Sequence, residues 1–557
     1  MPPKTIQLDP RDNVLVALSA LSAGESVSAN GHFYTVTMSI PAKHKLAMQN
    51  FPVNAEIRMY GVTVGRAREP IAQGGLLTTT NVAHDAAGFS APDSNHAGHY
   101  GWTPPDTSKW LDRTFAGYHR HDGQVGTRNY WLVVPLVFCE NRNVEALREA
   151  FEEELGYGRS NLYRQQVRER IQSYHQTGYL PNGDGHAVPS IPNSSSRVFP
   201  NRVFPNIDGI KFLLHQGGCG GTRDDSRALC GLLAGYIHHP NVAGATVLSL
   251  GCQNAQVSDL MAELGMRDPT HAKPVLVFEQ QKSGLESAML GDAIRQTFDG
   301  LVKANETERK PAPLSMLTVG LKCGGSDGFS GISANPALGQ VSDMFAALGG
   351  KTLLSEFPEL CGVEQNLIDR CARPETGERF AHLMRSYAAR AKAVHSGFEM
   401  NPSPGNIRDG LLTDAMKSAG AARKGGTAPV QDVLDYPEYV RSTGLSLQCT
   451  PGNDVECVTA QVGAGANLVL FTTGLGTPTG NPIAPVVKLA TNTKLAQRMS
   501  DIIDIDTGPI IEGASSIEAM RDSILELIVE VASGSTQTKA ESLRQDDFIP
   551  WKRGVSL

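Results

Sequence analysis

The feature that most constrains the fold of this 557-residue chain is a repeated alternation of short apolar runs, glycine-bearing loops and amphipathic segments. Residues 130–138, YWLVVPLVF, contain no charge, as expected of a strand buried on both faces, and the amphipathic segment 143–155 follows them. The same order recurs over 209–239 and 245–266. Strand, loop and helix in this repeated order predict a doubly wound parallel sheet of the α/β class.

Composition along the chain divides it into three units. Residues 1–88 are expected to form a small β-rich domain, because short runs of β-branched and aromatic residues alternate with turn residues. Residues 89–112 lose this periodicity and gain Pro, Gly and Ser, which predicts a linker. A central α/β domain is expected at 113–314, with a polar surface insertion at about 158–206, and a second α/β domain at 315–557.

Charge and composition narrow the class of function. The net charge is −7 and no basic face is evident, which argues against nucleic-acid binding. No apolar run reaches the roughly 20 residues that span a bilayer, and the amino-terminal stretch does not read as a signal peptide. The nine cysteines are widely spread, as thiols or metal ligands of a cytoplasmic protein would be. We expect a small-molecule partner, with neither nucleic acid nor membrane, and leave a homo-oligomer open.

Polar glycine loops follow four of the apolar runs, at strand ends where parallel sheets bind their ligands. They are HQGGCGGTRDD (215–225), GCQNAQ (251–256), KCGGSDG (322–328) and TTGLGTPTGNP (472–482). Glycine at this density lets the backbone turn sharply or approach a ligand closely. We therefore expect several of these loops to line one polar pocket.

Three of the cysteines, Cys219, Cys252 and Cys323, lie in these loops. Thiolates suit iron, zinc and Fe–S centres, whereas the alternative for each residue is a small buried hydrophobe. Cys139 also lies near a predicted strand end, and Cys230, within an apolar helical segment, is expected in the core.

Five titratable residues in the loops are candidates for acid–base chemistry. His215 is expected either as a metal ligand or proton carrier, or as a residue that only makes hydrogen bonds. Asp224 and Asp225 begin a predicted helix, where one could cap the helix and the other hold a cation or move a proton. Lys322 and Asp327 could bind a substrate carboxylate and transfer a proton, or form a salt bridge.

Long motifs in the chain resemble the altronate and galactarate dehydratases, a family of hydro-lyases. They are DGQVGTRNY (122–130), GLKCGGSDGFSGISANP (320–336), NPSPGN (401–406), TPGNDVE (450–456) and LFTTGLGTPTGNPIAPVVKLATNT (470–493). The amino-terminal unit resembles the small SAF domain that precedes the catalytic region in this family. The resemblance runs from about residue 5 to the end of the chain.

This resemblance implies loss of water from a sugar acid to give a 2-keto-3-deoxy acid, aided by Fe²⁺. D-altronate, which would give 2-dehydro-3-deoxy-D-gluconate, is the first expectation, and galactarate or another aldarate or aldonate is the alternative. A cation would stabilise the enediolate formed when the proton next to the carboxylate leaves. Cys219, Cys252 and Cys323 permit a second account of the cofactor, a [4Fe–4S] cluster with one open iron. A non-catalytic sugar-acid sensor is the alternative of another class.

Polar residues in the glycine loops and the matching motifs are candidates for substrate binding. They are Arg128, Asn129, Arg223, Asn254, Ser326, Asn453, Asp454 and Thr477. His44, in AKHKLA, matches a His-Lys of the family and is expected with His84 among the metal ligands. The family often has His-x-His-Asn late in the SAF domain, whereas this chain has TTTN, which leaves only Asn81. The chain therefore uses His84, uses other ligands or acts on a different sugar acid.

Overall fold

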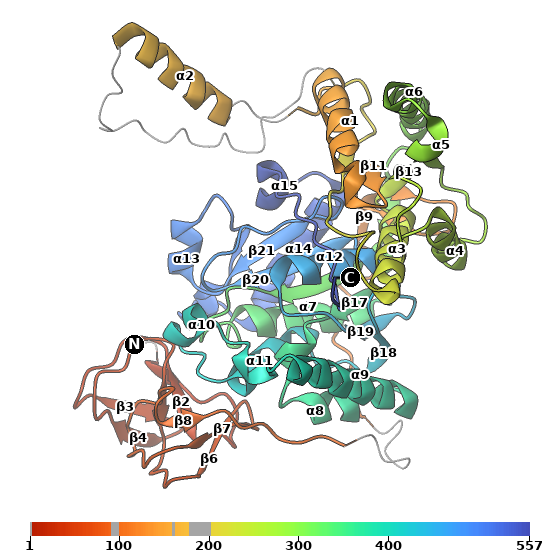
Figure 1. Cartoon of the computed structure of the whole chain (residues 1–557). Coiled ribbons are helices and arrows are strands. Elements are labelled where there is room, and N and C mark those ends of the chain that lie inside the picture. The colour runs from red at the N-terminus through yellow and green to blue at the C-terminus, as the bar shows by residue number, and fades with distance from the viewer. Residues whose placement is uncertain (1–2, 91–99, 159–161, 178–201, 557) are drawn as a thin grey trace.

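Three units follow one another along the chain in the computed structural model, which describes residues 3–90, 100–158, 162–177 and 202–556 (Figure 1). A small β-rich unit comes first, and two units built on parallel sheets follow it. The predicted α/β class with a small amino-terminal β unit is confirmed.

Short antiparallel strands build the amino-terminal unit. They are β1 Thr5–Ile6, β2 Val14–Ala17, β3 Ser26–Ala29, β4 His32–Thr35, β5 Lys45–Ala47, β6 Glu56–Met59, β7 Val62–Ala67 and β8 Val82–Ala83. They pair as β1-β2-β5, β3-β4 and β6-β7-β8. Because successive side chains of a strand point to opposite faces, Val14 and Val16 of β2 join one apolar cluster while Leu15 and Ala17 join another.

The second unit contains a four-stranded parallel sheet in the order β12-β11-β13-β14 and a small antiparallel sheet β10-β9-β15. Its strands are β9 Thr114–His119, β10 Val125–Gly126, β11 Tyr130–Pro135, β12 Gly209–Phe212, β13 Val242–Ser249, β14 Val275–Glu279 and β15 Lys310–Pro313. Its helices are η1 Phe138–Glu140, α1 Asn141–Glu154, α2 Leu162–Thr177, α3 Arg223–His238, α4 Val257–Arg267, α5 Gln280–Ser283 and α6 Glu286–Ala304. Strand β11 is buried throughout, as its uninterrupted apolar sequence predicts.

The third unit is built on a seven-stranded parallel sheet in the order β18-β19-β17-β16-β20-β21-β22. Its strands are β16 Thr318–Cys323, β17 Lys351–Leu354, β18 Val430–Leu434, β19 Gly444–Gln448, β20 Leu468–Thr473, β21 Val486–Ala490 and β22 Ile505–Asp506. Its α-helices are α7 Ala334–Ala347, α8 Glu364–Asp369, α9 Pro374–Ala393, α10 Pro404–Arg408, α11 Asp414–Ala422, α12 Asp454–Gly463, α13 Thr493–Arg498, α14 Ile517–Ser533 and α15 Lys539–Leu543. Short 3₁₀ turns are η3 Leu314–Met316, η4 Phe357–Leu360, η5 Phe398–Met400, η6 Arg423–Gly425 and η7 Gly508–Ile510.

The two α/β units share one apolar core where α3 of the second unit packs on α12 of the third. Gly235 and Gly463 lie at this crossing, and a Cβ atom added to Gly235 would come within 2.0 Å of the Gly463 carbonyl oxygen. A larger residue at position 235 would therefore force the two helices apart.

The amino-terminal unit packs against the carboxyl edge of the seven-stranded sheet. Lys45 of β5 donates to the Gly410 carbonyl at 2.5 Å, and the Thr413 hydroxyl donates to the Val64 carbonyl at 2.6 Å. Figure 1 shows this small unit beside α10 and α11 of the third unit. The strand-end loops of the third unit are thus covered by a unit that lies more than 300 residues earlier in the chain.

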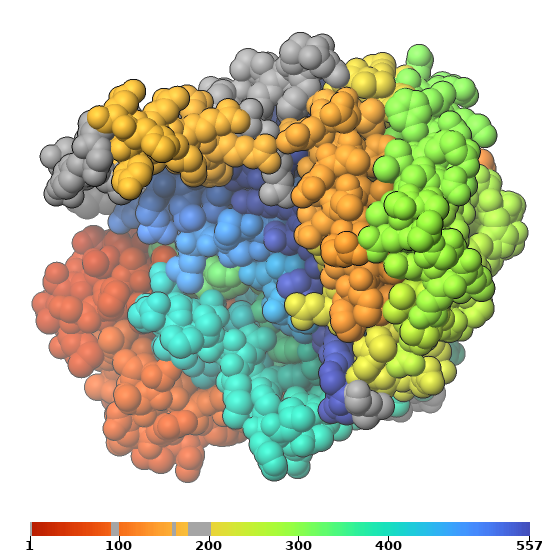
Figure 2. Space-filling view, turned by 45° about the horizontal axis from the view of Figure 1, so that its top comes forward, coloured from red at the N-terminus to blue at the C-terminus, as the bar shows by residue number. Residues whose placement is uncertain are grey.

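The end of the chain ties the third unit to the second. The Arg553 and Gly554 backbone N–H groups donate to Asp225 of α3 at 2.8 and 3.1 Å. Trp551 packs between Tyr387 and Tyr436 of the third unit. In Figure 2 the last residues, in dark blue, run along the junction between the yellow part of the second unit and the teal part of the third.

The predicted polar insertion is described only in part. Helix α2 carries exposed apolar side chains, including Tyr163 and Ile171, and lies apart from the other helices in Figure 1. Residues 159–161 and 178–201 of the insertion lie outside the described residues. Among the helices of the described ranges, none combines the length and apolar character needed to cross a bilayer.

Candidate active site

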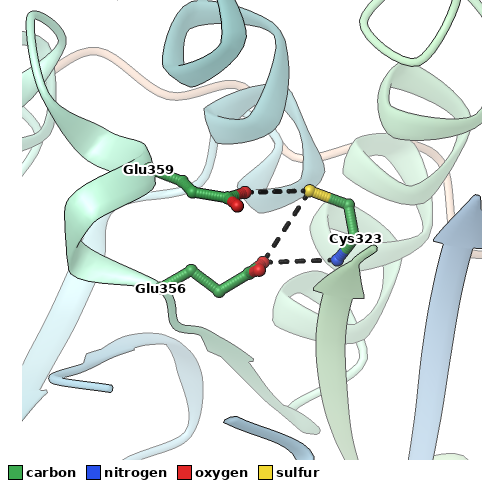
Figure 3. A group of neighbouring side chains, drawn as sticks. All are labelled: Cys323, Glu356 and Glu359. Carbon is green, nitrogen blue, oxygen red and sulfur yellow. Dashed lines mark hydrogen bonds between the residues drawn. The ribbon is translucent and has the colours of Figure 1, made fainter. Parts of the chain in front are cut away.

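The carboxyl edge of the seven-stranded sheet holds a buried group of ionisable side chains (Figure 3). Cys323 ends β16, while Glu356 and Glu359 follow the neighbouring strand β17. The Cys323 thiol donates to Glu359 Oε2 at 3.2 Å, and the Cys323 backbone N–H donates to Glu356 Oε2 at 3.2 Å. Glu356 has a left-handed backbone, with φ of 69°, which is uncommon for a non-glycine residue and turns its side chain toward Cys323.

Three lysines surround these acidic groups. Lys424 Nζ donates to Cys323 Sγ at 2.8 Å and to Glu356 Oε2 at 2.6 Å, and Lys322 Nζ donates to the other oxygen of Glu356. Lys417 Nζ lies 2.8 Å from Glu359 Oε1. Burial alone would lower the pKa of Lys424, but the acidic neighbours Cys323 and Glu356 raise it above its ordinary value. Lys424 therefore keeps its proton although it is fully buried.

The arrangement fits a divalent cation poorly. The candidate ligand atoms of Cys323, Glu356 and Glu359 all lie within 4.8 Å of one another, a spacing that one ion could bridge. However, lysine ammonium groups already bind both carboxylates and the sulfur. Burial also raises the pKa of the Cys323 thiol to about 12, so an incoming ion would have to displace the thiol proton as well as the lysine contacts. The group is a set of ion pairs rather than a ready metal centre.

Two of the three histidines of the amino-terminal unit, His44 and His84, were expected as metal ligands. His44 Nε2 bonds the Arg408 carbonyl at 3.1 Å, and burial lowers the pKa of both His44 and His84. Each keeps a buried Nδ1 without a hydrogen-bond partner in the described part of the chain. Among the described residues neither belongs to a group of three candidate metal ligands. Asn81 holds the TTTN turn, because its side chain accepts from the Thr78 N–H at 2.7 Å.

Asp327 joins the amino-terminal unit to the site. It is fully buried, and Lys43 Nζ lies 3.0 Å from its Oδ2 and 2.6 Å from Asp409 Oδ1. The Thr491 hydroxyl lies 3.1 Å from both Asp327 oxygens. Asp327 therefore acts here as an anchor for Lys43, whereas Lys322 pairs with Glu356 and Asp454, so the salt bridge expected between Lys322 and Asp327 does not form in the described residues.

A partly exposed polar rim lies above the buried ion pairs. Lys322 Nζ lies 3.0 Å from Asp454 Oδ1, and the Asp454 side chain is 27% exposed. Residue 324 has to be glycine, because a Cβ atom there would lie 2.4 Å from Asp454 Oδ1. At Gly325, where φ is +57°, a Cβ atom would lie 3.0 Å from the Thr477 hydroxyl. The glycines of this loop thus let the backbone approach Asp454 and Thr477 closely.

Three further polar residues belong to this rim. Asn401 accepts from Lys417 Nζ at 2.5 Å, and Ser326 keeps a buried hydroxyl without a hydrogen-bond partner among the described residues. Asn453 was expected to bind substrate, but its side chain caps helix α12 by accepting from the Val455 and Glu456 N–H groups at 3.1 and 3.2 Å.

His215 is fully engaged at the carboxyl edge of the other parallel sheet. Its Nε2 donates to the Pro135 carbonyl at 2.8 Å and its Nδ1 accepts from the Gly217 N–H at 3.1 Å. Burial lowers its pKa to about 4, so the ring stays neutral. The structure corrects the role of proton carrier or metal ligand, because neither ring nitrogen is available. His215 instead holds the loop that bears Cys219.

The aspartates after this loop also have structural roles. Asp225 accepts from two backbone N–H groups of the chain end, as described above, and Asp224 is exposed and paired with Arg227. Arg223 donates to Asn254 Oδ1 at 2.8 Å and so joins two strand-end loops. These contacts help to hold the second unit together, and the acid–base and substrate-binding roles expected for Asp224, Asp225, Arg223 and Asn254 stay predictions.

Arg128 and Asn129 lie at the junction between the units, away from the buried group at Cys323, and Arg128 lines a separate cavity with Tyr130. Arg128 is buried and forms an ion pair with Glu541 at 2.7 Å. Asn129 accepts from Arg120 at 2.9 Å and donates to the Asn206 carbonyl at 2.8 Å. These polar groups are satisfied within the protein, and the expected role of Arg128 and Asn129 in substrate binding stays a prediction.

The three loop cysteines do not come together. Cys323 is buried at the edge of the seven-stranded sheet, whereas Cys219 and Cys252 are exposed and follow β12 and β13 of the four-stranded sheet. A cluster bound by all three cysteines would require them to lie at the edge of one sheet. The expectation that Cys219, Cys252 and Cys323 bind one cluster is therefore wrong.

Sequence reasoning missed most of the buried ion pairs. Glu356 and Glu359 lie in SEFPEL, which looks like an ordinary turn, and Lys417 and Lys424 lie in a helical segment far from the glycine loops.

An α/β protein with a polar, lysine-rich site at the carboxyl edge of its parallel sheet, covered by an amino-terminal β unit, matches one family along nearly its whole length. The matching models describe the SAF domain of altronate/galactarate dehydratase (residues 3–85), the second domain of D-galactarate dehydratase/altronate hydrolase (117–305) and the C-terminal domain of D-galactarate/altronate dehydratase (314–556). The chain belongs to this family of dehydratases.

Named relatives agree with this assignment. The altronate dehydratase of Bacillus subtilis (strain 168) is 33% identical over 555 residues, covering 99% of both chains, and that of Escherichia coli (strain K12) is 32% identical with the same coverage. The galactarate dehydratase (L-threo-forming) of Escherichia coli (strain K12) is 30% identical over 505 residues, which cover 90% of this chain and 87% of that protein.

Proposed function

We propose that this chain is a hydro-lyase that removes water from a sugar acid, with D-altronate as the first substrate to test and galactarate as the second. The observation that carries the proposal is similarity along the whole chain. Two altronate dehydratases match 99% of it, whereas the galactarate dehydratase matches 90% at lower identity. The product expected from altronate is 2-dehydro-3-deoxy-D-gluconate.

The buried ion pairs suit an anionic substrate. Negative charge builds up on the substrate carboxylate as its neighbouring proton leaves, and cations fixed in place beforehand stabilise such charge. The ammonium groups of Lys322, Lys417 and Lys424 face the buried carboxylates of Glu356 and Glu359 and the partly exposed carboxylate of Asp454. Three ammonium groups fixed beneath the rim support recognition of a sugar acid.

Asp454 is our candidate for the base. It is the carboxylate of this group that solvent reaches, and Lys322, 3.0 Å away, fixes the position of its Oδ1. We assign Asp454 Oδ1 the role of accepting the substrate proton, and Asn401 and Thr477 the role of binding substrate hydroxyls. The Fe²⁺ implied by the family resemblance would supply a Lewis acid, but the lysine-paired group fits it poorly and no step of this assignment passes through it.

A panel of aldonates and aldarates tests the proposal. The purified protein, loaded with iron under anaerobic conditions, is incubated with each acid, and 2-keto-3-deoxy acids are measured. We expect turnover of altronate, and a loss of about 10²–10⁴-fold in kcat for Asp454→Asn, the range typical of a positioned base. Asp292→Asn, at an exposed position on α6, is the matched control and should retain activity. If the iron-loaded protein binds sugar acids but forms no product from any acid of the panel, the protein is a non-catalytic sensor and the proposal is wrong.

We also place the reaction in the cytoplasm. All nine cysteines are free thiols in the structure, a state that a reducing compartment preserves. Isolation of the active protein from cells with any of these thiols paired in a disulfide would argue against this location.

A further inference from the structure

Three cysteines that the proposed chemistry does not use follow three adjacent strands. Cys139, Cys219 and Cys252 come after β11, β12 and β13, which are neighbours in the order β12-β11-β13. All three strands are parallel, so their carboxyl ends meet at one edge of the sheet. All three thiols are exposed, whereas Cys230, in α3, is buried and its pKa is raised to about 12 by burial.

Backbone hydrogen bonds hold the three loops against one another. The Gly217 carbonyl accepts from the Phe138 N–H at 3.1 Å, and the Gly218 carbonyl accepts from the N–H groups of Asn254 and Ala255 at 2.8 and 3.0 Å. Gly218 has φ of +95°, and a Cβ atom there would lie 2.1 Å from the Leu136 carbonyl oxygen. Gly217 and Gly218 therefore hold the Cys219 loop against residues 136–138, which precede Cys139, and against residues 254–255, which follow Cys252.

The loops offer N–H donors as well as thiols. The backbone N–H groups of Cys219, Gly220 and Cys252 make no hydrogen bond with any residue in the described ranges. Gly220 and Gly251 have φ of +72° and +120°, the left-handed backbone that lets successive N–H groups turn toward a bound anionic group. Gln281 Nε2 donates to Cys252 Sγ at 3.2 Å, a contact that a thiolate would strengthen.

The thiols are too far apart for one metal ion to bind all three without movement of the loops. Within the described residues the three sulfur atoms do not all lie within 4.8 Å of one another. One zinc ion binds each sulfur at about 2.3 Å, so it would need the loops to move closer together. An Fe–S cluster carries its own sulfide bridges and accepts cysteine ligands that are further apart. His215, four residues before Cys219, has both ring nitrogens bonded within the protein and offers no free nitrogen as a ligand.

We propose that Cys139, Cys219 and Cys252 bind a [4Fe–4S] cluster through three of its irons. A cluster held by three cysteines would leave one iron without a protein thiolate. Cys219 also lines a cavity of about 530 Å³ together with Asp225, Glu456 and Trp551. Cys139 thus takes the place that the sequence had suggested for Cys323. The assignment stands on the geometry of the second unit and does not depend on which sugar acid the protein uses.

Anaerobic reconstitution of the full-length protein with Fe²⁺ and sulfide tests the assignment. Iron, acid-labile sulfide and visible absorption are measured after removal of unbound reagents. We expect bound sulfide in the wild type and its loss in each of Cys139→Ser, Cys219→Ser and Cys252→Ser. Cys323→Ser and Cys361→Ser, in the third unit, should keep the sulfide. Brief oxidation should release the one iron that no cysteine holds, and added Fe²⁺ should restore it.

The measurement separates this proposal from the proposed function, because sulfide binding is read without turnover. Circular dichroism of each serine variant checks that it folds. Iron bound without sulfide would overturn the proposal. Loss of sulfide in Cys323→Ser with retention in Cys139→Ser would overturn it as well. So would a wild-type protein that takes up no sulfide and shows a disulfide between two of the three cysteines.

Discussion

Lys45 has no exposed surface, and its ammonium donates only to the backbone carbonyls of Lys43 and Gly410. Burial lowers its pKa from 10.5 to about 7, although the nearby Asp327 opposes the shift. The unfolded chain keeps the lysine proton up to its ordinary pKa, whereas the folded protein releases it near neutrality. Because the unfolded state then binds more protons, the contribution of Lys45 makes the free energy of unfolding rise with pH between about 7 and 10.5.

Replacement of Lys45 by Met should remove this dependence. Methionine fills a similar volume without a charge, so Lys45→Met should be stabilised most, relative to wild type, at pH 7. The difference should shrink by up to about 1.4 kcal/mol per pH unit as the pH rises. Urea unfolding of both proteins across this range measures it, with Lys4→Met, at an exposed position, as the control. Parallel curves for wild type and Lys45→Met would contradict the prediction.

At the scale of the element, the loop between β16 and α7 depends on its glycines. They leave room for side chains from neighbouring elements. In Gly324→Ala the new methyl group would lie 2.4 Å from Asp454 Oδ1 and 2.5 Å from Phe471 Cζ. We expect Asp454 to move away from Lys322, with kcat falling at least about tenfold and the free energy of unfolding falling by about 1–3 kcal/mol. Steady-state kinetics and urea unfolding provide the two readouts.

Gly291→Ala is the matched control for this element. Gly291 lies in α6, and a Cβ atom added there meets nothing within 4 Å. Alanine favours a helix over glycine by about 1 kcal/mol, so this variant should be as stable as the wild type or more so, with unchanged kcat. Equal behaviour of the two variants would show that the crowding at position 324 has no effect.

At the scale of the whole molecule, Asp225 fixes the chain end across two units. Asp225→Ala removes the acceptor of the Arg553 and Gly554 N–H groups, which should lower the free energy of unfolding by about 1–3 kcal/mol and speed cleavage within 545–556. Limited proteolysis with mass spectrometry follows the cleavage. Asp224→Ala, one residue away but exposed, should be cleaved like the wild type. A common rate for all three proteins would disprove the anchoring role.

The parallel sheets could be predicted from the sequence because a strand buried on both faces leaves an uninterrupted apolar run, as in 130–135. The position of Lys322 and Asp454 at the edge of a sheet could be predicted, because both lie in recognisable motifs next to such apolar runs. Glu356 could not, since its position depends on a left-handed backbone and on Lys424, 68 residues away. The separation of Cys219 and Cys323 could not be predicted, because the sequence does not show whether the carboxyl edges of the two expected α/β domains face one shared pocket.

The contact of Lys43 with Asp409 spans 366 residues of chain. At synthesis rates of about 5–20 residues per second, the ribosome needs roughly 20–70 s to reach Asp409 after it has made Lys43. The amino-terminal unit, with its own strands and apolar cluster, is complete long before its docking surface exists. During this interval the lysine stays hydrated, and it loses water only when the strand-end loops of the third unit arrive. The active site is therefore assembled last, by docking of one folded part of the chain onto another.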